Sequence, residues 1–154
     1  MVVDAASGRS SADSVLDSGI SVAVSEEPCS EWVLHTVWPV LPEPTHATVR
    51  ELRDDFWSLW RRWHDEGALL AADVCWPVES LFLAACVADD PEARTWEGPY
   101  PLVDTSSIRL AAGFVPTAIE ERLPSEEPVH NPEADARQSA RLLLEALASL
   151  RSRR

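Results

Sequence analysis

A short apolar run at Ala68–Ala72 lies between two segments of helical periodicity, and this order limits the fold more than any other feature of the chain. The preceding segment, residues 46–66, predicts an amphipathic helix because apolar side chains recur every three or four residues: Val49, Leu52, Phe56, Trp60 and Trp63. Gly67 ends that helix, and residues 77–88 predict the next one. The apolar run itself suits a buried strand. A strand between helices indicates the α/β class.

The remaining elements extend this pattern to both ends of the chain. In order, we expect strands at residues 1–5, 19–24 and 32–37 in an antiparallel meander, a short strand at 102–104, a short helix at 106–112, an irregular stretch at 114–129 and a helix at 132–150. The last helix is the clearest, because Asn131 can cap it and Pro132 suits its first position. The sequence predicts one domain over residues 1–150, with a mixed sheet flanked by helices, and a basic tail at 151–154.

The chain is strongly acidic, with a formal net charge of −13. This charge argues against broad electrostatic capture of nucleic acid, but not against an enzyme that reaches phosphate through metal ions held by carboxylates. The three cysteines, Cys29, Cys75 and Cys86, are odd in number and lack metal-ligand spacing. With no apolar run long enough to cross a bilayer and no signal pattern, we expect a cytoplasmic protein without a membrane partner.

His130 and Asp135 are the two residues of this sequence that are best placed for catalysis. His130 precedes the last predicted helix, and Asp135 lies in its first turns. A carboxylate on a rigid helix can hold a metal ion while a loop histidine takes a proton from a water molecule. Two magnesium ions about 4 Å apart can stabilise both the attacking and the leaving oxygen of a phosphodiester. The simpler alternatives are a loop histidine and a first-turn carboxylate that favours the helix dipole.

Residues 130–137 (HNPEADAR) resemble the third motif of the DEDDh 3′→5′ exonucleases, a family with the ribonuclease H-like fold. The resemblance implies that His130 is the general base and Asp135 a metal ligand. Residues 102–105 resemble the short strand that usually precedes this motif, and residues 32–41 are similar to a segment of actinobacterial-type members. The family implies a pair of Mg²⁺ or Mn²⁺ ions and, as partners, the 3′ ends of DNA or RNA.

The family's second motif has two candidate positions in this chain. It places an Asp in the helix after the fourth strand, behind an aromatic residue and before Phe-Leu. Residues 77–83 (PVESLFL) fit that frame with Glu79 in place of the Asp, whereas Asp73 at the strand end has the right residue type. Both remain candidate metal ligands. Trp76 and Asn131 are the candidate substrate-binding residues.

The first motif departs from the family pattern of Asp-x-Glu on the first strand. Asp4 fits the Asp as a metal ligand, but Ala6 stands where the Glu is expected. That Glu normally binds a metal and orients the attacking water. One hypothesis is therefore a metal-dependent 3′→5′ exonuclease acting on single-stranded DNA, RNA or oligonucleotides. The alternatives are a weakened or inactive exonuclease-fold module that binds nucleic acid or a protein partner, and an interaction protein unrelated to nucleases.

Overall fold

A short mixed sheet forms the centre of the molecule. The computed structural model describes residues 2–4, 30–115 and 121–153. The strands are β1 (Val2–Asp4), β2 (Ala68–Ala72) and β3 (Val103–Asp104), in the order β1-β2-β3. β1 pairs with β2 in antiparallel orientation and β2 with β3 in parallel orientation. Among the described residues the chain is thus a mixed α and β protein, as the sequence predicts at this coarse level.

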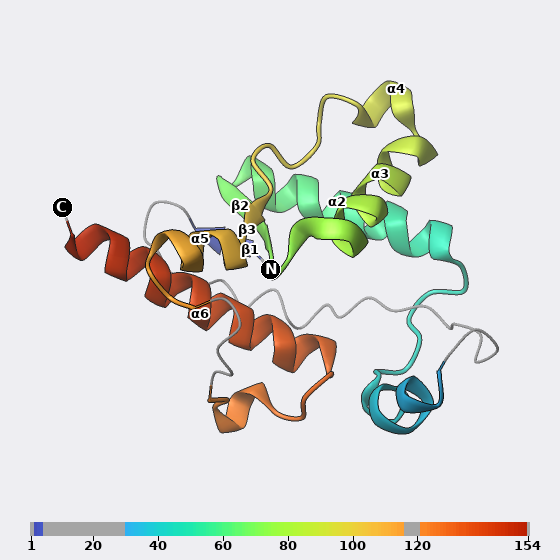
Figure 1. Cartoon of the computed structure of the whole chain (residues 1–154). Helices are drawn as coiled ribbons and strands as arrows, with labels where there is room; N and C mark the ends of the chain where they lie inside the picture. The colour runs from blue at the N-terminus through green and yellow to red at the C-terminus, as the bar shows by residue number, and fades with distance from the viewer. Residues whose placement is uncertain (1, 5–29, 116–120, 154) are drawn as a thin grey trace.

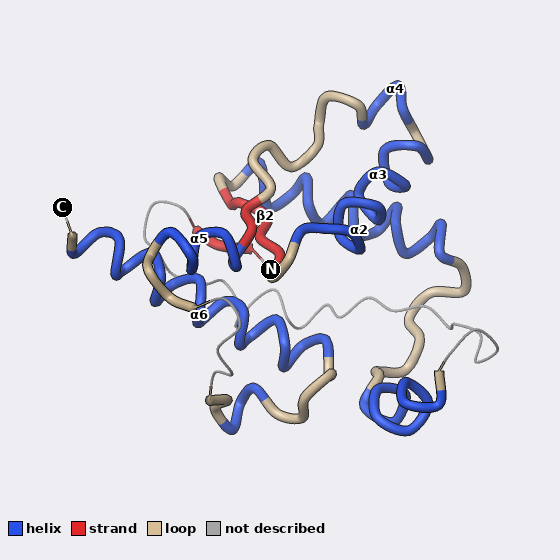
Figure 2. The backbone as a smooth tube through the Cα atoms, in the orientation of Figure 1, coloured by secondary structure: helices blue, strands red, loops and turns tan. Residues whose placement is uncertain are grey.

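Helices surround this sheet (Figure 1). They are α2 (Val49–Asp65), α3 (Ser80–Asp89), α4 (Pro91–Arg94), α5 (Thr105–Ala111) and α6 (Pro132–Ser152). Shorter π- and 3₁₀-helical segments lie at Val33–Val37, Trp38–Val40, Cys75–Glu79 and Pro124–Glu126. The tube in Figure 2 shows how small the strand content is beside the helices, with α6 crossing one side of the sheet and α2 and α3 lying on the other.

The sheet is covered on both faces, because β2 contributes to two separate hydrophobic clusters. Leu70 packs with Trp57, Trp60 and Cys86 of α2 and α3. The next residue, Ala71, packs with Leu143 of α6. Successive side chains of a strand point to opposite faces, so the two clusters lie on opposite sides of β2. This burial on both faces is why the strand has a continuous apolar sequence rather than an alternating one.

The sequence predicts α2 well because its ends carry strong local signals. Thr48 Oγ1 accepts the Glu51 N–H at 3.1 Å, and the Glu51 carboxylate accepts the Thr48 N–H at 3.1 Å, which is a capping box. At the other end, Gly67 has a φ of 86°, a left-handed conformation that favours glycine. Together these signals fix the helix to within three residues of the predicted range.

The start of α6 is also confirmed. Asn131 Oδ1 accepts the N–H groups of Glu133 and Ala134, both at 3.1 Å, and Pro132 occupies the first turn. Asn131 Nδ2 donates to the Val40 carbonyl at 3.0 Å, which ties this helix start to the segment before α2. The helix continues to Ser152, so it includes the beginning of the predicted tail.

The strand predicted at residues 32–37 is wrong. Val33–Val37 is a π-helix followed by the 3₁₀ turn Trp38–Val40, and Ser30 starts it by accepting the Val33 N–H at 3.3 Å. The apolar residues of this segment lie beside the start of α6, where Trp32 meets His130, and do not pair in a sheet. Residues 32–37 therefore form no third strand of a meander, and the strand predicted at 19–24 lies outside the described residues.

Candidate active site

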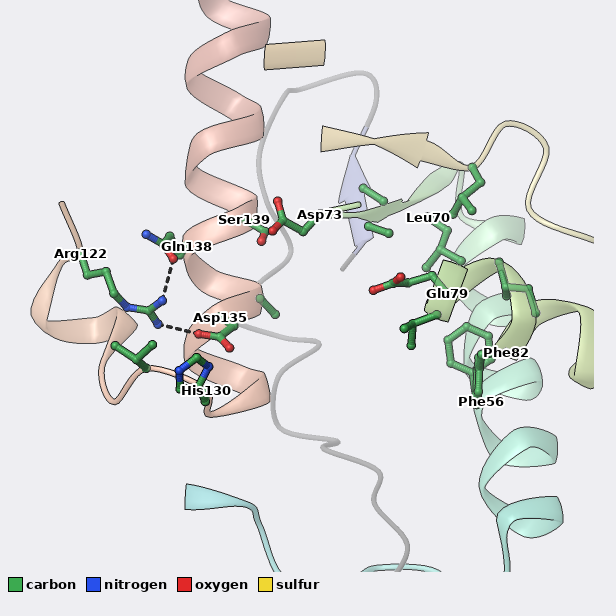
Figure 3. Close-up of a pocket in the computed structure, with 17 residues that line it drawn as sticks. Phe56, Leu70, Asp73, Glu79, Phe82, Arg122, His130, Asp135, Gln138 and Ser139 are labelled. Carbon is green, nitrogen blue, oxygen red and sulfur yellow. Dashed lines mark hydrogen bonds and ion pairs between the residues drawn. The ribbon is translucent and has the colours of Figure 1, made fainter. Parts of the chain in front are cut away.

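One pocket collects the candidate residues from widely separated segments of the chain. It has a volume of about 670 Å³ and is lined by the end of β2, the start of α3, the loop before α6 and the first turns of α6. Asp73, Glu79, His130 and Asp135 all line it. Figure 3 shows His130 and Asp135 on one side, Glu79 on the other, and Asp73 between them in this view. The two candidates for the second motif thus contribute to the same pocket.

Asp73 directly follows β2, and its pKa reflects the burial and the charges around it in the pocket. Its side chain is exposed at the surface, yet surrounding protein atoms desolvate it, and this raises the pKa of the carboxyl. The positive charge of Arg109 opposes the rise. The negative charges of Asp104, Glu79 and Asp135 add to it. The pocket therefore concentrates negative charge in a way that a bound cation would relieve.

Asp104 fixes the segment that carries Asp73 and Glu79. Its Oδ2 accepts the Cys75 N–H at 2.8 Å, and its Oδ1 accepts the Ser107 N–H at 2.6 Å at the start of α5. Desolvation opposes ionisation of Asp104, but the hydrogen bonds from Ser107 and Cys75 outweigh it and lower the pKa. Sequence reasoning missed this role, although an Asp immediately before a helix is a recognisable capping signal.

The thiol of Cys75 lies next to this clamp and is not suited to act as a thiolate. Desolvation, with the neighbouring Asp104 and Glu79 charges, raises the pKa of Cys75 to about 11. A thiol with such a pKa is protonated at neutral pH, whereas nucleophilic and metal-binding cysteines act as thiolates. The oxygen ligands of the pocket are therefore the relevant donors.

His130 is held in an unusual backbone conformation. Its φ is 67°, in the left-handed region, which is uncommon for a residue with a side chain. Trp32 meets the imidazole edge-on with ring centroids 5.2 Å apart, and the neighbouring Asn131 is anchored to Val40. These contacts hold the half-buried His130 in the pocket wall. Left-handed backbone of this kind often occurs where a side chain must be aimed at a functional site.

Asp135 forms an ion pair that the sequence did not reveal. Arg122 Nη2 donates to Asp135 Oδ1 at 2.8 Å, while Nη1 donates to Gln138 Oε1 at 2.7 Å (Figure 3). Arg122 Nε donates to the Glu126 carbonyl at 2.7 Å. Arg122 belongs to a stretch that the sequence left irregular, and no motif pointed to it. Asp135, the metal ligand expected from the third motif, is thus paired with a guanidinium.

A buried ion pair supports the loop that carries Arg122. The Glu126 side chain is 2% exposed, and its Oε1 and Oε2 accept Nε and Nη2 of Arg141 at 2.6 and 3.0 Å. Glu126 Oε2 also accepts the Leu123 N–H at 2.9 Å. The hydrogen bond from Arg141 holds the pKa of Glu126 below its usual range. This pairing fixes residues 122–126 against α6 and so positions Arg122.

Three other predicted site residues lie elsewhere or already have partners. The backbone of Asp4 pairs with Ala68, at the opposite end of β2 from Asp73, about 16 Å away along an extended strand. The register thus does not bring the Asp4 backbone to the Asp73 end of the sheet. Trp76 is 72% exposed and stands in the segment between Asp73 and Glu79. Both polar atoms of the Asn131 amide are used in backbone hydrogen bonds, which favours a structural role for it.

The pocket fits a divalent cation in the kind of donor it offers. Asp73, Glu79 and Asp135 supply the carboxylate oxygens that magnesium and manganese prefer. Desolvation, together with repulsion from the neighbouring carboxylates, raises the pKa of Asp73. In the described part of the chain, however, no three His, Cys, Asp or Glu side chains lie close enough to hold one ion together. Asp135 is instead paired with Arg122.

Comparison with protein-family models, with curated proteins and with solved structures finds no match for this chain. Within the described ranges, no helix combines the length and apolar character needed to cross a membrane. The residues of the pocket therefore carry the functional assignment by themselves.

Proposed function

We propose that this chain is a metal-dependent 3′→5′ exonuclease that hydrolyses phosphodiester bonds at the 3′ ends of single-stranded DNA, RNA or oligonucleotides. The supporting observation is that one pocket is lined by His130, Asp135, Asp73 and Glu79. These are four of the five catalytic and metal-binding residues that motif resemblance selects from separate segments of the sequence; the fifth is Asp4, whose backbone pairs at the other end of β2. An accidental match of residues 130–137 would not require the second-motif candidates to share a pocket with them.

Each pocket residue has a role that its surroundings support. Asp73, Glu79 and Asp135 would hold Mg²⁺ or Mn²⁺ through carboxylate oxygens. The bound ion supplies charge stabilisation at the phosphoryl oxygens and lowers the pKa of water. His130, on a loop fixed by Trp32, accepts the proton of the attacking water. Trp76, exposed in the segment between the pocket residues Asp73 and Glu79, offers a stacking surface for a base of the substrate.

The proposal includes a ribonuclease H-like fold, and what supports it is a mixed sheet with helices on both faces. β2 leads to the second-motif candidates, and α6 begins at the third-motif candidates. The free Cys75 and Cys86 are consistent with the reducing cytoplasm expected from the sequence.

The direct test is incubation of the purified protein and Mn²⁺ with 5′-labelled single-stranded DNA and RNA. The expected result is stepwise shortening from the 3′ end, which His130→Ala and Asp135→Asn each reduce by about 100-fold or more. His46→Ala is the matched control, because His46 pairs with Asp55 at 3.4 Å and does not line the pocket. If the native protein releases no nucleotides, or if His130→Ala retains the native rate, the proposal is wrong.

A weakened or inactive exonuclease-fold module is the second candidate. Two observations favour it: Ala6 replaces the first-motif Glu, and Arg122 neutralises Asp135. Such a module would bind 3′-ended single strands, measured by fluorescence anisotropy, without shortening them in Mn²⁺. Ala6→Glu separates the candidates further. If the native protein already turns over and Ala6→Glu does not raise its rate, loss of catalysis is the wrong account.

A further inference from the structure

We propose that Arg122 is a built-in competitor for the metal at Asp135: its guanidinium neutralises the carboxylate in the metal-free protein, and a divalent cation binds by displacing it. This inference rests on the proposed function and adds a form of regulation to the same site. The observation behind it is the Arg122–Asp135 pair inside the pocket, with Nη2 2.8 Å from Oδ1.

Arg122 is held in place from several directions. Its Nη1 donates to Gln138 Oε1 at 2.7 Å, and Nε and Nη2 both donate to the Glu126 carbonyl, with Nε at 2.7 Å. These bonds orient the guanidinium so that Nη2 also reaches Asp135. Its side chain is 15% exposed. Charge-assisted hydrogen bonds in such partly buried positions are stronger than those of freely moving surface pairs. The pairing is therefore a defined state of the pocket.

A metal ion at Asp135 and this position of Arg122 work against each other. An ion coordinated by Asp135 would stand within a few ångströms of the guanidinium, and two like charges at that distance repel strongly in a partly desolvated pocket. Oδ1 is already engaged by Nη2. Without either the metal ion or the Arg122 guanidinium, the negative charge of Asp135 would add to those of Asp73 and Glu79 without compensation. The guanidinium thus provides part of the charge compensation that the ion would provide.

The structure also offers Arg122 another acidic partner. The carboxylate of Glu127 lies 3.8 Å from Arg122 Nε, and its side chain is 52% exposed. A small rotation of the guanidinium toward Glu127 would keep an ion pair while releasing Asp135. Because one ion pair is exchanged for another, Asp135 can be released without leaving the guanidinium unpaired, which suits a reversible exchange.

The test compares Mn²⁺ binding by calorimetry to the native chain, Arg122→Gln and Arg137→Gln. Arg137 is the matched control, because it is an arginine of α6 that pairs with Glu133 at 2.7 Å and does not line the pocket. We expect Arg122→Gln to bind Mn²⁺ at least about fivefold more tightly than the native chain, the lower end of ordinary coupling between sites. Arg137→Gln should match the native affinity.

A second variant guards against loss of structure in Arg122→Gln. Gln138→Leu removes the acceptor of Nη1 but leaves both Arg122 and Asp135 intact, so it should tighten Mn²⁺ binding by a smaller factor. If both variants bind Mn²⁺ no more tightly than a native chain that does bind it, Arg122 is not a competitor, and the proposed function stands. If neither the native chain nor the folded variants bind Mn²⁺, both proposals fail.

Discussion

The carboxylate of Asp104 accepts the backbone N–H of Cys75 at 2.8 Å, across 29 residues of sequence. With its other oxygen it caps α5 through the Ser107 N–H at 2.6 Å. One side chain therefore holds the segment after β2 against the start of a helix. Because Asp73 and Glu79 lie on either side of Cys75, this clamp determines where both carboxylates stand in the pocket.

Asp104→Ala removes the clamp and the helix cap together. We expect the free energy of unfolding to fall by about 2–3 kcal/mol, since a charged acceptor and an N-cap are both lost. Urea denaturation followed by circular dichroism measures the change. Asp90→Ala is the control, because Asp90 caps only the four-residue α4 through the Ala93 N–H, and it should cost less than about 1 kcal/mol. Equal losses in the two variants would show that Asp104 is no more than a helix cap.

Arg141→Met should be strongly destabilising because it leaves Glu126 buried without its main partner. Breaking a buried pair by removing one member typically costs about 3–5 kcal/mol. Arg137→Met removes a more exposed pair with Glu133 and should cost no more than about 1 kcal/mol. Chemical denaturation of both variants checks the contrast, and a small loss for Arg141→Met would mean that Glu126 is rehydrated or protonated at little cost.

The same buried pair predicts a pH dependence of stability. The folded pKa of Glu126 lies below its ordinary value of 4.5, so ionised Glu126 stabilises the fold above that pH. This contribution is lost as the pH falls through the depressed folded value. Thermal melts from pH 6 downward should therefore show a steeper loss below about pH 4.5 in the native chain than in Glu126→Gln. Parallel curves would contradict the assignment.

Asp73 predicts a pH dependence of stability opposite in sign to that of Glu126. Its pKa is raised on folding above 3.8, so the ionised carboxylate destabilises the fold at neutral pH, and the cost disappears as the pH falls below 3.8. Asp73→Asn should raise the melting temperature at pH 7 and leave it unchanged near pH 3. Saturating Mn²⁺ should stabilise the native chain more than Asp73→Asn if this carboxylate is a ligand. A lower melting temperature for Asp73→Asn at pH 7 would refute the electrostatic account.

The sequence predicts those elements whose determinants are local. The capping box at Thr48 and Glu51 and the Asn131 cap identify α2 and α6, and the continuous apolar run identifies β2. The strand prediction for residues 32–37 is wrong because a short apolar run suits a strand and a helical turn equally well. Their conformation depends on contacts with the start of α6, such as that of Trp32 with His130, which lie almost 100 residues away in sequence.

The residues of the candidate site also divide into those with a local sequence signal and those without one. His130, Asp135, Asp73 and Glu79 could be selected from the sequence because their segments resemble family motifs. Arg122 could not, because its role depends entirely on how residues 121–130 fold back onto α6. A single arginine in an irregular, acidic stretch carries no local signal, and ion pairs of this kind are decided by tertiary structure.

Substitution of Trp76 tests whether its side chain contributes to oligonucleotide binding or to stability. Its side chain is 72% exposed, and it precedes by two residues Val78, which is 69% exposed and lines the pocket. Replacing it with Ala should change the free energy of unfolding by no more than about 0.5 kcal/mol, because little burial is lost. The same change should weaken binding of a single-stranded oligonucleotide by about 1 kcal/mol or more, the ordinary contribution of one stacked base.

Fluorescence anisotropy with a labelled oligonucleotide, measured beside thermal melts, checks both halves of the Trp76 prediction. Trp96→Ala is the matched control, since Trp96 is 88% exposed and lies outside the segment that carries Asp73 and Glu79. Trp76→Phe should retain most of the affinity, because a phenyl ring still presents a stacking face. If Trp76→Ala binds as tightly as Trp96→Ala, the exposed indole is not a base platform. If it instead lowers the melting temperature, its contribution is to folding, and the substrate must be held by the residues that line the pocket.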